Sequence, residues 1–548
     1  MPLEHGGNAR TWENTMRGHG GSLRGLETTR QVSGGRFGRM FDVEGPEFPD
    51  GVIESLAAAM IRPDAGAPID RAEPEDENPA IPAGYTYFGQ FVDHDITFDP
   101  TPLRHQAVDV EALEDYRTPA LDLDSVYGRG PDDQPYLYDG VRLRPGLPVD
   151  SPGALVGTHH DLLRLPPDAR DRSVAVIGDR RNDENKLVAQ MHGTMAALHN
   201  RLLHDTPLLE RLGGDTRTAE GRFRIATTAA RWHYQWVVLF DFLAGHVCHP
   251  GVVERILNAG GTPRLRHYAR HGPAAAYLPV EFSGAAYRFG HSMVRPGYAL
   301  NQAVGADAVR HPHRIPTFDT GRDRRDNLNG GGMALPSDWG IDWAFFLDGI
   351  PTRAPRPALR IAQPSYRIDA SLAGPLGALP EFRDSSPAAT ANLAYRNLAR
   401  GNMLRLPSGE QVAERLGLTP LPPDVLWSAG SRTARAVPGP LREVAALRRQ
   451  VFERHRRSLQ GCTPLWYYVL REAEFAGVER IDADPARDHG GQHLGPVGSR
   501  LLAETFIGLL WFDRTSFLHH PLGFRPLLPD HTGRDFRLAD LVSYALSS

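Results

Sequence analysis

Residues 83–98 carry the sequence AGYTYFGQFVDHDITF, and this stretch decides how the rest of the chain is interpreted. Pro82 fixes the backbone angle with which a helix begins, and apolar or aromatic residues recur behind it at helical spacing. The residues on this pattern are Tyr87, Phe88, Phe91 and Val92. The stretch therefore predicts a mostly buried helix.

Four polar side chains interrupt the apolar pattern of this helix, namely Gln90, Asp93, His94 and Asp95. Burying so much polarity costs several kcal/mol unless each group has a partner. Gln90 and His94 lie four residues apart and share one face, while the two aspartates flank the histidine and point elsewhere. A single buried histidine is more often a core residue than a ligand. The set of four nevertheless favours a bound cofactor or metal, and one helix can serve two sites.

The chain has 548 residues, a length that by itself suggests three or four domains. The candidate ligands described below run from Gln90 to Asn397, so their convergence would require one large domain. Residues 1–50 are rich in glycine and arginine and are expected to form an arm that packs on the body. Residues 51–548 are expected to form the catalytic domain.

Composition excludes several classes of partner. The net charge of -5 provides no long-range field for nucleic acid or for an anionic membrane, so neither partner is expected. No apolar run approaches the roughly 18 residues that a membrane span needs. We therefore expect a protein without a membrane span.

The chain contains two cysteines, Cys248 and Cys462, without the spacing of a disulfide framework or a thiolate metal site. The first residues lack the charged start and apolar centre of a secretory signal. These features predict a cytoplasmic setting, with export by a leaderless route as the alternative. Neither cysteine indicates an intermolecular bridge, so the oligomeric state is not predicted from the sequence.

The loop at 118–130, TPALDLDSVYGRG, places Thr118, Asp122 and Asp124 at alternating positions between proline and glycine residues. Oxygen ligands of this kind are typical of a hard cation, and Asp95 at the end of the first helix could complete the set. Acidic turns are more often merely solvated, so the loop alone is weak evidence of a metal.

Residues 176–205 contain GDRRNDEN followed by an apolar stripe, which predicts a long helix with acidic residues near its start. Its C-terminal half has the pattern of a capped surface helix. The segment holds two adjacent arginines, Arg180 and Arg181. Residues 217–247 predict a second long helix, which we assign to the core.

Residues 285–296, AAYRFGHSMVRP, place His291 among aromatic and apolar residues. A histidine that binds iron needs an acceptor on its other ring nitrogen. The remaining histidines, such as His159 and His160, are interpreted as surface or packing residues.

Together the segments GQFVDHD, TPALDLDSVYGRG, GDRRNDEN, AAYRFGHSMVRP and NLARGNMLRLPSG resemble the animal-type haem peroxidases of the peroxidase–cyclooxygenase superfamily. The resemblance covers roughly residues 50 to 525. It implies a mainly α fold, in which a single large helical domain carries long ordered loops and little β-structure.

The resemblance also assigns roles to individual residues. It implies that His291 is the proximal iron ligand and that Asn397 accepts its second ring proton. His94 would be the distal base, Arg181 the distal arginine, and Gln90 the group that holds a water or a halide.

The implied cofactors are haem b and calcium. Asp93 and Glu184 match the carboxylates that form ester bonds to haem methyl groups in the mammalian enzymes. Asn185 stands where the neutrophil enzyme has a methionine, so a third link is not expected. The implied calcium ligands are Asp95, Thr118, the carbonyl of Ala120, Asp122 and Asp124. The animal enzymes usually have serine at the position of Asp124.

The resemblance implies a peroxidase that uses hydrogen peroxide to oxidise phenolic or similar small donors, or halides. A fatty-acid dioxygenase of the same superfamily is the first alternative. Such enzymes carry a radical tyrosine three residues before the proximal histidine, where this chain has Arg288, as the peroxidases do; Tyr287 lies one position earlier. A non-catalytic haem- or calcium-binding scaffold is the second alternative. A role in tailoring one metabolite stays open, and the donor is not predicted.

Overall fold

The computed structural model describes most of the chain. The described ranges are 35–62, 77–98, 114–115, 117–157, 159–258, 261–269, 276–305, 315–317, 326–353, 362–382, 388–428, 439–476, 490–521, 523–528 and 536–547. Residues 1–34, which form most of the predicted N-terminal arm, lie outside them.

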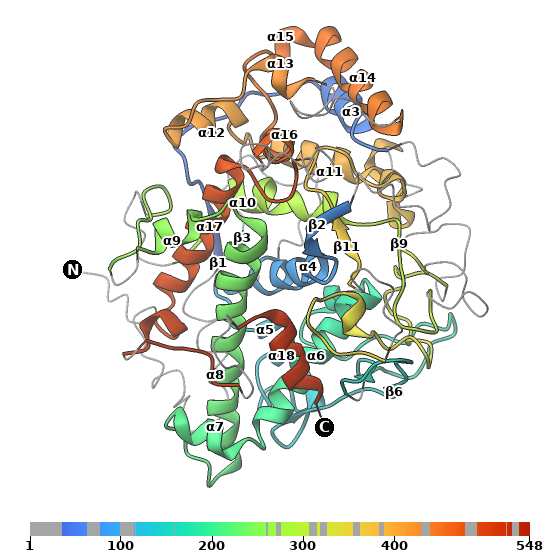
Figure 1. Ribbon diagram of the computed structural model, residues 1–548, viewed down its shortest axis with the longest axis vertical. Coiled ribbons are helices and arrows are strands. Elements are labelled where there is room, and N and C mark those ends of the chain that lie inside the picture. Colours follow the sequence, from blue (N-terminus) through green and yellow to red (C-terminus); the bar gives the residue numbers. More distant parts are fainter. Residues whose placement is uncertain are drawn as a thin grey trace.

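Helices dominate the described residues (Figure 1). The α-helices are α3 (Asp50–Ala58), α4 (Gly84–Ile96), α5 (Asp124–Tyr127), α6 (Lys186–Leu202), α7 (Thr206–Arg211), α8 (Ala219–Trp236), α9 (Val252–Leu257), α10 (Val280–Gly284), α11 (Leu393–Met403), α12 (Gly409–Arg415), α13 (Pro423–Leu426), α14 (Gly439–Arg454), α15 (Arg456–Leu459), α16 (Leu465–Ala476), α17 (Pro496–Phe512) and α18 (Leu538–Leu546). A π-helix, η6 (Val237–Val247), continues α8. The 3-10 helices are η4 (Pro135–Leu137), η5 (Arg180–Asp183), η7 (Ala286–Met293), η9 (Trp343–Phe345), η10 (Gly374–Gly377), η11 (Pro380–Phe382), η12 (Ala388–Ala391) and η14 (Phe517–His519).

The strands are short and scattered among the loops. Strand β1 (Gly35–Gly38) pairs antiparallel with β3 (Glu114–Asp115) and parallel with β8 (Leu278–Pro279). The remaining pairs are antiparallel: β2 (Glu77–Pro82) with β11 (Pro364–Tyr366), β4 (Tyr138–Asp139) with β5 (Arg142–Leu143), β6 (Pro148–Val149) with β7 (His159–His160), and β9 (Gly297–Tyr298) with β10 (Ile315–Pro316). The prediction of a mainly α domain with little β-structure is confirmed.

Helix α4 lies at the centre of the molecule (Figure 1). Its aromatic side chains Phe88 and Phe91 are fully buried and meet the ring of Tyr234 on α8 edge-on. Helix α4 also contacts α6, η5 and η7. The first helix predicted from the sequence is therefore the element on which the surrounding helices pack.

Two local signals set the ends of the helices around the site. Helix α4 stops at Thr97, whose backbone is extended and whose hydroxyl donates to the backbone oxygen of Asp93 at 3.0 Å. Helix α6 begins after Asn185, whose side chain accepts a hydrogen bond from the backbone N–H of Leu187 at 2.8 Å. The segment before α6, which contains η5, therefore lies outside this helix and contacts α4.

The prediction that the C-terminal half of 176–205 is a surface helix is wrong. Residues 193–202 of α6 are all buried or only partly exposed, and even the polar His199 is fully buried, because helices α8 and α18 pack against α6. Within the described residues, no helix is both long and apolar enough to cross a membrane.

Candidate functional site

His94 lies in the last turn of α4 and is 5% exposed. Its Nδ1 atom lies 2.8 Å from the side-chain oxygen of Asn182 in η5. Burial, followed by the charge of Arg181, lowers the pKa of His94 to about 4. The imidazole is therefore neutral near neutral pH.

Arg181 contacts the same end of α4. Its Nη2 atom donates to the backbone oxygen of His94 at 2.9 Å and pairs with Asp179 at 2.7 Å. Its guanidinium also lies 4.7 Å from the centre of the Phe98 ring. The adjacent Arg180 is exposed. Of these two neighbours, Arg181 is therefore the one that contacts α4.

Arg117 is a buried cation that the sequence analysis missed. It pairs with Asp124 at 2.9 Å and with Asp179 at 2.5 Å, and all three side chains are nearly inaccessible. Burial opposes the ionisation of Asp179, but its bonds to Arg181 and Arg117 outweigh this effect and hold its pKa below the usual range. Arg117 thus joins the acidic loop to the segment that carries Arg181.

Close backbone contact brings these two segments together. A Cβ atom at Gly178 would lie 2.6 Å from the backbone oxygen of Ser125, so the approach requires glycine at this position. The GDRRNDEN segment therefore rests directly on the 118–130 loop.

His291 lies in η7, and the side-chain nitrogen Nδ2 of Asn397 on α11 lies 2.8 Å from its Nδ1 atom. An amide presents either its oxygen or its nitrogen to a neighbour by a half-turn. With the oxygen toward Nδ1, Asn397 accepts the Nδ1 proton and leaves a lone pair on Nε2. Burial, followed by Arg288, lowers the pKa of His291 to about 3. The structure therefore joins two residues that lie 106 positions apart in the sequence.

Four more predicted residues belong to the segments around these histidines. Gln90 and Asp93 are half-buried on α4, and Glu184 is exposed at the end of η5. Arg288 donates from Nε to the backbone oxygen of Ser283 at 2.9 Å. Burial, followed by the nearby charge of Arg400, lowers the pKa of Arg288 to about 10.

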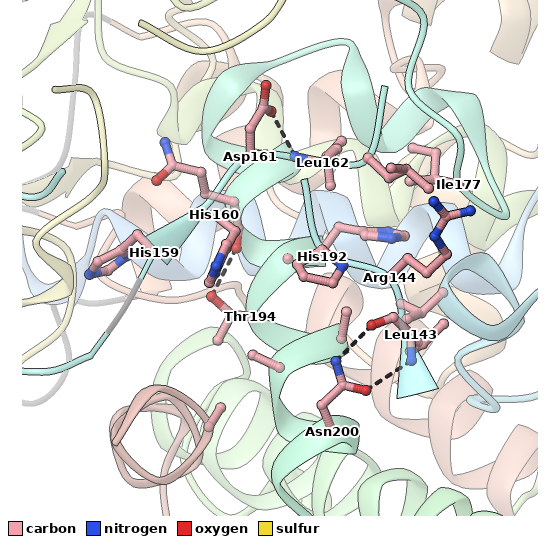
Figure 2. A pocket seen from close by; sticks show the side chains of 18 of the residues that line it. Leu143, Arg144, His159, His160, Asp161, Leu162, Ile177, His192, Thr194 and Asn200 are labelled. Atoms are coloured by element: carbon pink, nitrogen blue, oxygen red, sulfur yellow. Dashed lines mark hydrogen bonds between the residues drawn. The ribbon is translucent and has the colours of Figure 1, made fainter. Parts of the chain in front are cut away.

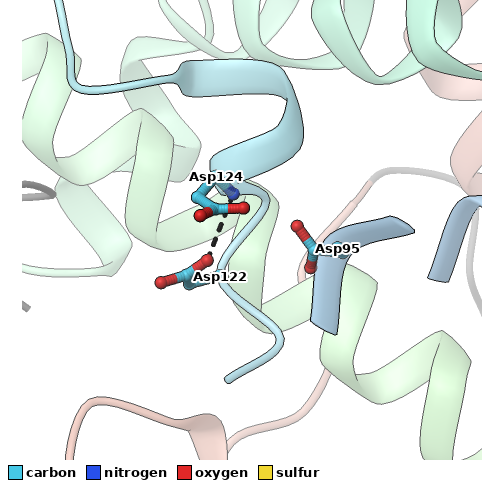
Figure 3. A group of neighbouring side chains, drawn as sticks. All are labelled: Asp95, Asp122 and Asp124. Carbon is cyan, nitrogen blue, oxygen red and sulfur yellow. Dashed lines mark hydrogen bonds between the residues drawn. The ribbon is translucent and has the colours of Figure 1, made fainter. Parts of the chain in front are cut away.

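The predicted cation ligands form a second cluster that includes Asp95, the residue after His94 (Figure 3). One carboxylate oxygen from each of Asp95, Asp122 and Asp124 lies within 4.8 Å of the others, and all three residues are buried. The hydroxyl of Thr118 donates to Asp122 at 2.9 Å, and Ala120 is buried in the same loop. The structure therefore brings all five predicted calcium ligands into one region.

Mutual repulsion shapes the chemistry of this acidic cluster. Burial, followed by Asp122 and Asp124, raises the pKa of Asp95 well above its ordinary value. Burial and Asp124 likewise raise the pKa of Asp122 to about 7. Leu123 holds a left-handed backbone (φ 58°), and its N–H donates to Asp95 at 3.1 Å. A strained loop thus gathers carboxylates that a cation would stabilise.

A cavity of about 230 Å³ lies beside α6 (Figure 2). Its wall includes His159, His160 and His192. His159 is 7% exposed and its Nε2 atom has no hydrogen-bond partner among the described residues. Both His159 and His160 therefore line a cavity, which the sequence analysis did not foresee.

No protein-family model matches the chain, and no curated protein matches its sequence. Among solved structures, peroxidase A from Dictyostelium discoideum superimposes over 94% of this chain and 92% of its own, with a TM-score of 0.52 and 14% sequence identity. This chain has the fold of that peroxidase. Two structures of fatty acid alpha-dioxygenase also match the chain. The one from Arabidopsis thaliana has a TM-score of 0.45 and 11% identity, and the match covers 90% of this chain and 73% of its own. The one from Oryza sativa has a TM-score of 0.47 and 12% identity, and the match covers 92% of this chain and 78% of its own.

Proposed function

We propose that this chain is a haem-dependent peroxidase that uses hydrogen peroxide to oxidise small organic donors or halides. One observation carries the proposal. The buried His94 and the half-buried His291 lie on α4 and η7, which pack against each other, and each has its Nδ1 atom against an asparagine amide. With an amide oxygen toward each Nδ1, each ring has Nε2 available, one for iron and the other for a proton.

The residues around His291 suit haem b. Its neutral imidazole, with Asn397 as acceptor at Nδ1, would bind the haem iron through Nε2. Arg288, Asp93 and Glu184 would contact the porphyrin. When bound, haem would supply the two electrons that reduce hydrogen peroxide, and the donor would return them.

His94 would act as the general base and acid. Its free Nε2 takes a proton from hydrogen peroxide and returns it to the oxygen that leaves as water. Arg181, held beside it by Asp179, would stabilise the negative charge that develops on that oxygen. Gln90 would hold a water on the same side.

The dioxygenase alternative requires a radical tyrosine at the position of Arg288. The neighbouring Tyr287 is buried, and its hydroxyl donates to the backbone oxygen of Gly89 at 3.1 Å. This contact supports a structural role for Tyr287 and hence the peroxidase. Oxygen uptake with linoleate, without added peroxide, would instead favour the dioxygenase.

The visible spectrum tests the proposal. Protein expressed with supplied haem should show a high-spin ferric Soret band that shifts on addition of one equivalent of hydrogen peroxide, and His291→Ala should lose the band. No Soret band in the parent chain would contradict the proposal. Unchanged peroxide turnover in Arg181→Ala would favour a non-catalytic scaffold.

We also propose ester bonds between haem methyl groups and Asp93 and Glu184. After peroxide treatment, acid–acetone should leave haem on the protein, because an ester bond resists extraction. The variant Asp93→Asn/Glu184→Gln should release all of its haem. Complete extraction from the parent chain would contradict the ester bonds.

Calcium is the cation that we propose for Asp95, Thr118, Ala120, Asp122 and Asp124. The support is the set of oxygen atoms in a buried loop, where neutralisation by a divalent cation would remove the repulsion between the carboxylates.

Calcium should therefore stabilise the folded state. Adding calcium to chelator-treated protein at 100 times its Kd should raise the free energy of unfolding by about 2.7 kcal/mol, measured by denaturant titration. Asp122→Asn should abolish the increase, whereas Asp424→Asn, at an exposed position on α13, should keep it. An equal increase in both variants would place the cation elsewhere.

A further inference from the structure

Three buried side chains form a hydrogen-bonded row that leads away from the distal histidine. Nδ1 of His94 lies 2.8 Å from Oδ1 of Asn182, and Nδ2 of Asn182 lies 3.1 Å from Nδ1 of His192 on α6. Their exposed fractions are 5%, 0% and 4%. Bulk water is therefore excluded from both contacts.

The amide in this row links the protonation patterns of the two rings. Its oxygen only accepts hydrogen bonds and its NH₂ group only donates them. In the observed orientation, His94 must carry its proton on Nδ1 and His192 must carry its proton on Nε2. The reversed orientation of Asn182 requires the opposite tautomer of both rings.

Only one of these two states suits the proposed chemistry. With the proton on Nδ1, His94 has a free lone pair on Nε2 and can accept a proton from peroxide. With the proton on Nε2, the same atom cannot act as a base. The orientation of the Asn182 amide therefore decides whether His94 is competent.

We infer that His192 is a positioning residue that holds His94 in its base-competent tautomer through Asn182. The catalytic consequence rests on the proposed function, whereas the tautomer of His94 can be measured independently of it. His192 lines the cavity beside α6, so its ring also borders a space that water or a small acceptor can enter (Figure 2).

The surroundings of His192 support this role. Burial lowers its pKa to about 4, and Asp179 is the charged group that opposes this shift. The ring is consequently neutral, and its Nδ1 lone pair is available to accept from Asn182. A protonated His192 would carry hydrogen on both nitrogens and would oppose the observed amide orientation.

Isosteric variants at position 192 separate positioning from packing. His192→Leu removes the acceptor for the amide, while His192→Asn has nearly the same shape and keeps a polar partner. In Asn182→Asp the carboxylate can only accept, so His94 keeps its Nδ1 proton whatever residue stands at position 192.

Cyanide binding to the haem-loaded protein supplies the kinetic measurement, because hydrogen cyanide must lose its proton to a base. His192→Leu should slow cyanide association and the reaction with peroxide by about five-fold, the factor that corresponds to one ordinary hydrogen bond. His192→Asn should retain most of both rates. Carbon monoxide binding to ferrous haem needs no proton transfer and should not change.

The ring nitrogens of His94 supply a measurement that does not depend on turnover. The protein is labelled with ¹⁵N-histidine and, if haem is bound, is measured as the ferrous carbonyl complex. The ring signals of His94 are those that are absent from the His94→Gln variant, and they should report an Nδ1–H tautomer. His192→Leu should shift these signals toward a mixture. The inference is wrong if the tautomer does not change, or if His192→Leu slows cyanide equally in the Asn182→Asp background. A parent chain without haem would contradict the proposed function, while the tautomer of His94 would still test the inference.

Discussion

His94→Gln is expected to lower the rate constant for the reaction with hydrogen peroxide by about 10²- to 10⁴-fold. Glutamine keeps polar atoms in the pocket but has no titratable nitrogen to take a proton from peroxide. The neutral state of His94 supports this role, since burial lowers its pKa to about 4. Stopped-flow mixing with peroxide, followed at the Soret band, measures the rate constant directly.

His199→Gln provides a matched control for this measurement. His199 on α6 is also fully buried, and burial lowers its pKa to about 4 as well, but its ring bonds to Tyr127 and to the backbone oxygen of Val141. This variant should lose stability and keep the peroxide rate of its folded fraction. If His94→Gln reacts as fast as the parent chain, His94 is not the base.

Arg117→Leu is expected to lower the free energy of unfolding by about 3–5 kcal/mol. Removing this cation leaves the buried carboxylate of Asp124 without its partner at 2.9 Å, and takes one of two guanidinium groups from Asp179. The loss also loosens the contact that holds Arg181, so peroxide reactivity should fall as well. Denaturant titration with and without calcium measures the change.

Two further variants show whether the effect comes from buried charge. Asp124→Asn in the Arg117→Leu background should recover part of the lost stability, because the buried carboxylate that has lost its ion pair with Arg117 is then removed. Arg217→Leu breaks an ion pair with Asp215 in which the arginine side chain is 89% exposed, and should leave the unfolding midpoint unchanged. Equal losses in Arg117→Leu and Arg217→Leu would show that burial of the pair is unimportant.

Local sequence was enough to predict the central helix. The apolar spacing within 83–98 predicts a buried helix, and the structure places α4 at Gly84–Ile96 with Phe88 and Phe91 fully buried. Helical periodicity and start signals act over a few residues, so they can be read without the rest of the chain. The helical spacing within 83–98 also predicts that His94 and Asp95 lie on different faces of the helix. The structure confirms this, because His94 contacts Asn182 whereas Asp95 contacts the acidic loop.

The environment of a helix was harder to predict, because it depends on distant segments. The sequence of 176–205 indicated a surface helix in its second half, but α8 and α18 cover that face of α6. His159 and His160 were likewise interpreted as surface or packing residues, and they line a cavity. Burial depends on the path of the whole chain, which a periodic pattern does not specify.

By itself the sequence determined the central helix and the buried polar residues that favour a cofactor or metal, and its resemblance to a family implied the mainly α fold and the haem and calcium sites. Only the tertiary structure decided that Arg181 donates to the backbone oxygen of His94, that Arg117 joins the acidic loop to Asp179, and that Asn182 lies between two histidines. Hydrogen bonds and ion pairs require positions within about 3–4 Å, and side chains up to hundreds of residues apart reach such distances only once the chain has folded.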